Sequence, residues 1–158
     1  MSLPPLDGRG FLPDGCYKAT YQEISKRFCF NQSRQYLFQQ FLDFLDHINH
    51  LDNNKKYLGI TVNTPIILSG SFFTDKPYPS DIDCVFILGD VENDVRWFWS
   101  NRLRIYNQEF KAQYSVDFNV ELPRLGDFAK FFAYVGPKDA ATKNLNPKDL
   151  RGIISLIR

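Results

Sequence analysis

Apolar residues recur along the chain with two different spacings, which separate predicted helices from predicted strands. One long stripe repeats every three or four positions: Leu37, Phe41, Phe44, Ile48 and Leu51. This spacing predicts an amphipathic helix over about residues 32–52, with Asn31 as its N-cap. A shorter helix is predicted over 21–28, because Thr20 and Glu23 have the spacing of a capping box. Such stripes cover a sheet, so strands are expected elsewhere.

Four segments have the composition of strands. The apolar run 66–68 and the segment 82–88 are predicted as buried strands, and the run 153–157 as a last strand. Segment 114–121 alternates with period two, which predicts a strand with one buried face. Its residues divide into Val116, Phe118 and Val120 toward the core and Ser115, Asp117, Asn119 and Glu121 away from it.

The remaining segments predict two more helices and irregular connections. One helix is expected from Asn93 to about Lys111, and a short one over 127–134. Residues 1–16, rich in proline and glycine, predict an irregular N-terminal arm. Residues 57–60 predict a short extended piece in a polar loop.

Composition narrows the class of protein. At 158 residues, the chain is predicted to form a single α+β domain spanning 1–158. A formal charge of +1 argues against a protein that holds nucleic acid mainly through a large basic surface. Cys16, Cys29 and Cys84 have no Cys-x-x-Cys spacing, which is typical of a reducing cytoplasm. No signal peptide or long apolar span is evident, so a cytoplasmic protein without membrane contact is expected.

The candidate chemistry lies in the segment that links the predicted strands 66–68 and 82–88, and at the start of the second of them. Asp81 and Asp83 point to the same side of a strand, where two carboxylates repel each other unless a cation lies between them. Oxygen ligands of this kind suit Mg2+. Gly70 and Ser71 form a turn that allows a phosphate to approach the backbone. Asp117, on the alternating strand, is the expected third carboxylate.

This combination resembles the nucleotidyltransferase superfamily that includes DNA polymerase β, kanamycin nucleotidyltransferase and the minimal nucleotidyltransferases. The resemblance implies a palm-like fold, a small mixed β-sheet flanked by helices. It also implies that Asp81 and Asp83 hold two Mg2+ ions, for which Mn2+ may substitute, while Asp117 binds the first metal and activates the acceptor hydroxyl. Gly70 and Ser71 would then grip the triphosphate.

A closer resemblance extends over nearly the full length. The chain is similar to small bacterial nucleotidyltransferase-like proteins, mostly uncharacterised. The similar segments are Phe11–Gly15, Ala19–Phe28, Asn31 with Arg34, Gly70–Asp83 and Arg151–Ile154. Within them, Lys76 is a candidate ligand of the triphosphate and Arg34 a weaker one for the same task.

The function implied is transfer of a nucleotide from an NTP or dNTP to a hydroxyl acceptor, with release of pyrophosphate. Small members of the superfamily make nucleotide messengers or short oligonucleotides in anti-phage defence, which is the context we favour. Others belong to toxin–antitoxin pairs and modify a partner protein or tRNA. A protein encoded by a neighbouring gene is therefore an expected partner. A catalytically silent module that senses nucleotides or binds a partner is a further alternative.

The predicted helix that ends near Lys111 allows another interpretation. Its aromatic residues alternate with arginines, as base stacking and phosphate pairing require. An amphipathic helix with aromatics in the core and cations in solvent explains the same pattern, and we favour that interpretation. The near-neutral charge of the chain also weakens the nucleic-acid interpretation.

Overall fold

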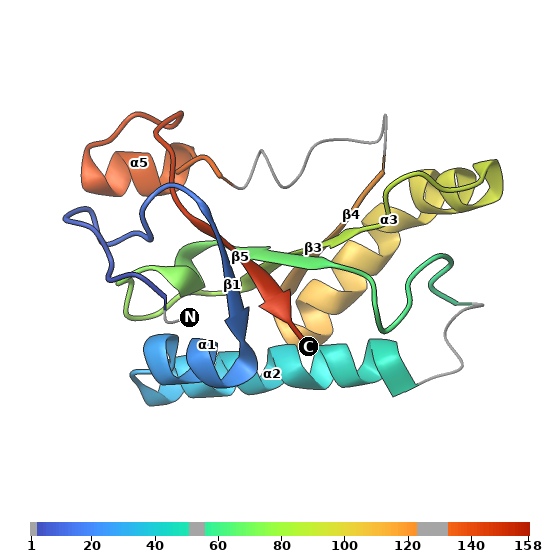
Figure 1. Ribbon diagram of the computed structural model, residues 1–158, viewed down its shortest axis with the longest axis horizontal. Helices are drawn as coiled ribbons and strands as arrows, with labels where there is room; N and C mark the ends of the chain where they lie inside the picture. Colours follow the sequence, from blue (N-terminus) through green and yellow to red (C-terminus); the bar gives the residue numbers. More distant parts are fainter. Residues whose placement is uncertain (1–2, 51–55, 123–132) are drawn as a thin grey trace.

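Five strands form one mixed sheet in the order β1-β5-β2-β3-β4 (Figure 1). The computed structural model describes residues 3–50, 56–122 and 133–158. The strands are β1 (Cys16–Thr20), β2 (Ile66–Ser69), β3 (Ile82–Ile87), β4 (Val116–Glu121) and β5 (Ile153–Ile157). The outer pairs β1–β5 and β3–β4 are parallel, whereas β2 is antiparallel to both β3 and β5. The first and last strands of the chain therefore lie side by side.

Helices lie on both sides of this sheet. In Figure 1, α1 (Tyr21–Phe28) and α2 (Gln32–His50) lie along one face of the sheet, and α5 (Pro137–Lys143) lies beyond the other. Helix α3 (Asn93–Tyr114) packs against β4 and α2. The described residues thus form a mixed α/β architecture, which is compatible with the predicted α+β class. None of the helices in the described part of the chain is long and apolar enough to cross a membrane.

The core between the helices and the sheet is largely aromatic. Phe44 of α2 is fully buried and meets Phe86 of β3, Phe110 of α3 and Phe118 of β4, with ring centroids 5.0–6.3 Å apart. All three ring pairs are edge-to-face, a geometry that aromatic quadrupoles favour. The many phenylalanines of the sequence therefore fix the sheet on its helices.

The predicted elements are largely confirmed where the structure describes them. The four predicted strands are present, although Tyr114 is the last residue of α3 and the strand begins at Val116. The side-chain oxygen of Asn31 accepts a hydrogen bond from the backbone N–H of Arg34 at 2.8 Å, so it caps α2 as expected. Thr20 and Glu23 form the predicted capping box.

Three differences have local causes. The prediction of an extended piece over 57–60 is wrong: this segment turns, with Gly59 at φ 84°. Strand β1 was missed because only Ala19 of its five residues is buried, and α5 because it buries only Ala140. Most of the helix predicted over 127–134 lies outside the described residues.

Candidate metal and phosphate site

Three carboxylates meet beside the neighbouring strands β3 and β4. Asp83 lies on β3 directly beside Asp117 of β4 in the parallel register, and opposite Ser69 of β2. Asp81 immediately precedes β3. One carboxylate oxygen from each aspartate lies within 4.8 Å of the others, which is the spacing of ligands around a metal ion. The structure therefore brings together the three aspartates that the sequence singled out.

The alternation of the strands places these carboxylates on one side. Ile82 and Cys84 are fully buried against the helices, so Asp83 faces away from that core. On β4 the buried residues are Val116 and Phe118, so Asp117 faces the same way as Asp83. The parallel pairing of β3 with β4 then places the side chains of Asp83 and Asp117 next to each other. Backbone pairing alone is sufficient for this placement.

The electrostatics of the cluster favour the binding of a positive charge. Burial and, after it, the nearby charges of Asp81 and Asp117 together raise the pKa of Asp83 to about 8. Burial also raises the pKa of Asp81, although Lys111 opposes this rise from 3.6 Å. A half-buried group of carboxylates with such poor compensation fits a divalent cation that prefers oxygen ligands, as Mg2+ does.

Helix α3 supplies two residues that the sequence analysis did not assign to the site. The side-chain amide of Asn107 donates to Asp117 Oδ1 at 2.6 Å and to the carbonyl of Phe118 at 2.7 Å. Lys111, one helical turn later, forms the ion pair with Asp81. The spacing of four residues on the helix directly before β4 was the available signal, since it places both side chains on one face.

The Gly70–Ser71 turn lies against the carboxylates. Gly70 has φ 97°, and a Cβ atom built there would lie 2.7 Å from Asp83 Oδ2. Any larger residue would therefore be strained and would collide with the acid. Ser71 begins a short 3-10 helix, η1 (Ser71–Phe73), and both turn residues line the same cavity as the aspartates.

Arg34 does not have the role that was expected of it. Its guanidinium is fully buried and donates hydrogen bonds to backbone carbonyls. The acceptors are the carbonyl oxygens of Phe28, Ser71, Phe72, Thr74 and Lys76. Burial lowers its pKa to about 10. Because its donors are used by the backbone of the loop after Gly70, Arg34 fixes that loop rather than contacting a triphosphate.

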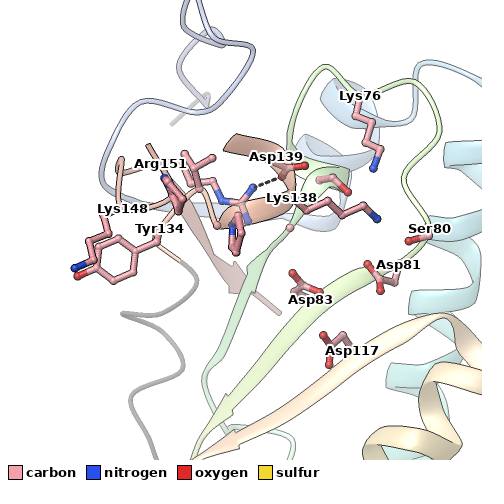
Figure 2. Close-up of a pocket in the computed structure, with 16 residues that line it drawn as sticks. Lys76, Ser80, Asp81, Asp83, Asp117, Tyr134, Lys138, Asp139, Lys148 and Arg151 are labelled. Atoms are coloured by element: carbon pink, nitrogen blue, oxygen red, sulfur yellow. Dashed lines mark hydrogen bonds and ion pairs between the residues drawn. The ribbon is translucent and has the colours of Figure 1, made fainter. Parts of the chain in front are cut away.

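The aspartates form one wall of a cavity of about 650 Å³. Four cationic residues also line it: Lys76, Lys138, Lys148 and Arg151. In Figure 2, Lys76 and Lys138 extend toward the end of the cavity that holds Asp81, whereas Lys148 lies at the opposite end. A cavity that is acidic on one wall and basic on the other suits a metal-bound polyphosphate.

Arg151 is the most buried of these cations, with 7% of its surface exposed. Its Nη1 lies 3.4 Å from Asp139 Oδ2 of α5, drawn as a dashed line in Figure 2. Its positive charge also opposes the rise in the pKa of Asp83. Arg151, Lys138 and Lys148 could not be recognised from the sequence, since no local spacing connects them with the aspartates.

The fold and the site together define a mixed α/β protein with a carboxylate centre suited to a divalent cation. The chain belongs to the family of unknown function DUF6932, whose model matches residues 4–156. Searches of the curated proteins and of the solved structures returned no match.

Proposed function

We propose that this protein is a metal-dependent nucleotidyltransferase with a palm-like fold of the polymerase β type. It would transfer a nucleotide from an NTP or dNTP to a hydroxyl acceptor and release pyrophosphate. One observation supports this most directly: the three clustered aspartates and the Gly70–Ser71 turn line the same cavity, opposite cationic side chains. Clustered like charges cost stability, so a role in binding a cation explains their presence.

The three aspartates, Asp81, Asp83 and Asp117, are the residues that would hold Mg2+. When bound, the metal supplies Lewis-acid chemistry toward the phosphate oxygens and the attacking hydroxyl, and Mn2+ can take its place. Asn107 binds Oδ1 of Asp117, and Asn119 lies 3.5 Å from the same oxygen. Oδ2 of Asp117 is therefore the oxygen that would accept the proton of the acceptor hydroxyl, and Asp117 would join Asp81 and Asp83 in holding the metal.

The remaining cavity residues would orient the triphosphate. Gly70 lets the phosphates approach the backbone, and the Ser71 hydroxyl can donate to a phosphate oxygen. Lys76, Lys138 and Arg151 provide positive charge in the same cavity as the carboxylates. Arg34 would support triphosphate binding indirectly, because it holds the carbonyls of Ser71 and Lys76 in place.

The direct test is incubation of the purified protein with each labelled NTP and dNTP in Mg2+ or Mn2+, alone and with the product of a neighbouring gene. We expect transfer of label with release of pyrophosphate, and its loss in Asp83→Asn. Asp43→Asn, an exposed acid on α2, is the matched control and should behave like the wild type. Mg2+-dependent nucleotide binding without turnover would point to the silent sensing module. The absence of both nucleotide binding and nucleotide transfer would refute the proposal.

A further inference from the structure

One face of α3 carries a row of polar and aromatic side chains that the proposed chemistry only partly uses. These residues are three or four positions apart and are called here the α3 stripe: Trp97, Ser100, Arg104, Asn107 and Lys111. The stripe is distinct from the buried side of the helix, which holds Trp99 and Phe110. It therefore faces outward beside β4 instead of packing into the core.

The stripe reaches the carboxylate centre at one end only. Asn107 is hydrogen-bonded to Asp117 and Lys111 is paired with Asp81. Toward the other end, Trp97 has 69% of its surface exposed, which is unusual for so large an apolar side chain. The distance along the helix axis from residue 97 to residue 111 is about 21 Å, the span of about six nucleotides at the ~3.4 Å spacing of a stacked strand.

The chemistry of the stripe matches a single-stranded nucleic acid. An exposed indole offers a face for a base, and the guanidinium of Arg104 can pair with a phosphate. The hydroxyl of Ser100, which lies between them, can bond to sugar and phosphate oxygens. The formal charge of +1 does not conflict with this, because a short strand needs only a few cations along its own path.

We propose that the acceptor is the 3′ end of a single-stranded oligonucleotide lying along the α3 stripe, with its terminal hydroxyl at Asp117. This inference rests on the proposed nucleotidyl transfer. The 3′ oxygen forms a bond to the α-phosphorus, and the bond from that phosphorus to the pyrophosphate oxygen breaks. The hydroxyl proton passes to the Asp117 carboxylate, and pyrophosphate leaves with the electron pair. The oligonucleotide grows by one nucleotide.

Arg102 provides a matched control within the same helix. It is exposed, as Arg104 is, but lies roughly 160° around the helix from it, because each residue turns the helix by about 100°. Loss of Arg102 removes the same charge from the protein without touching the stripe. The variants to compare are therefore Trp97→Ala, Arg104→Ala and Arg102→Ala.

The experiment measures binding and extension of fluorescent single-stranded DNA and RNA oligomers of about eight nucleotides. Trp97→Ala should bind them about 10-fold more weakly, the loss expected for one stacked base. Arg104→Ala should also lower the slope of log affinity against log salt by about 0.7, the value for one phosphate contact on a single strand. Arg102→Ala should match the wild type, and an oligomer lacking its 3′ hydroxyl should bind without being extended.

The outcomes separate this inference from the proposed function. Mg2+-dependent NTP binding should be unchanged in Trp97→Ala and Arg104→Ala, while Asp83→Asn should lose transfer but keep oligonucleotide binding. If the wild type does not bind oligonucleotides, or if Arg102→Ala weakens binding as much as Arg104→Ala, the acceptor assignment is overturned even if nucleotide transfer occurs. Transfer to a protein with no effect of Trp97→Ala would overturn it as well.

Discussion

Replacing Asp83 by asparagine is expected to stabilise the metal-free protein, and increasingly so as the pH rises. Asparagine keeps the shape of the side chain but cannot ionise. The wild-type carboxyl has a pKa of about 8 in the folded protein against an ordinary value of 3.8, chiefly because it is buried and then because Asp81 and Asp117 lie nearby. The folded protein therefore holds a proton that the unfolded chain releases.

The sign of the effect follows from this proton balance. Between about pH 4 and pH 8 the unfolded chain binds fewer protons than the folded one, so the free energy of unfolding falls as the pH rises. Each unit of pKa difference corresponds to about 1.4 kcal/mol, so the cost of keeping Asp83 should be on the order of 4 kcal/mol at pH 7. Asp83→Asn should lack this part of the pH dependence.

Urea denaturation in the presence of a chelator, at pH values from about 5 to 8, measures the difference. The stability advantage of Asp83→Asn over the wild type should grow by about 1.4 kcal/mol for each pH unit. The control Asp43→Asn, on the exposed side of α2, should follow the wild type. Parallel curves for Asp83→Asn and wild type would refute the account of a strained carboxylate centre.

Adding Mg2+ and a nucleotide should raise the free energy of unfolding of the wild type more than that of Asp83→Asn. A ligand present at about a hundred times its dissociation constant adds about 2.7 kcal/mol to the free energy of unfolding of the protein that binds it. Asp83→Asn should gain little, so the difference between the two proteins should shrink by about this amount. An equal gain in both would mean that Asp83 is not part of the binding site.

Three further predictions concern residues around the centre. Gly70→Ala should lose at least about 1 kcal/mol of stability because of its positive φ, and its nucleotide affinity should fall further than that of Ser71→Ala, measured by calorimetry with Mg2+. Arg34→Met should lose about 3 kcal/mol or more in urea denaturation, and Arg34→Lys less, because methionine removes every hydrogen bond that the guanidinium donates to backbone carbonyls. Asn107→Ala should lower kcat more than it raises KM; an effect on KM alone would contradict its proposed role in orienting Asp117.

The placement of the carboxylates could be predicted from the sequence because it depends on the alternation within single strands. Ile82 and Cys84 are apolar, so Asp83 between them had to face the other side. The same pattern applied to Asp117 between Val116 and Phe118. What the sequence could not supply was the pairing of β3 with β4, since strand register depends on contacts between segments about thirty residues apart.

The basic wall and the role of Arg34 could not be predicted for a different reason. A buried guanidinium is stable only where several acceptors surround it, and all those of Arg34 except the Phe28 carbonyl come from a loop about forty residues away. Likewise, Arg151 and Lys138 reach the cavity because β5 pairs with β1 and β2 and carries its preceding segment to the site. Such contacts between distant segments cannot be predicted from local sequence patterns.

The two walls of the cavity are anchored in different ways, and this bears on how the site would work. Asp83 and Asp117 project from strands of the main core, and Asp81 directly precedes one of them, so the strand register fixes these acids before any ligand arrives. The segment around α5 instead packs on a small separate cluster of Phe11, Val135 and Ala140. A ligand with both a metal and phosphates would bind the two walls at once. Its binding energy would then draw the segment around α5 toward a carboxylate centre that is already formed. The cost of gathering the acids is therefore met in folding and not during the reaction.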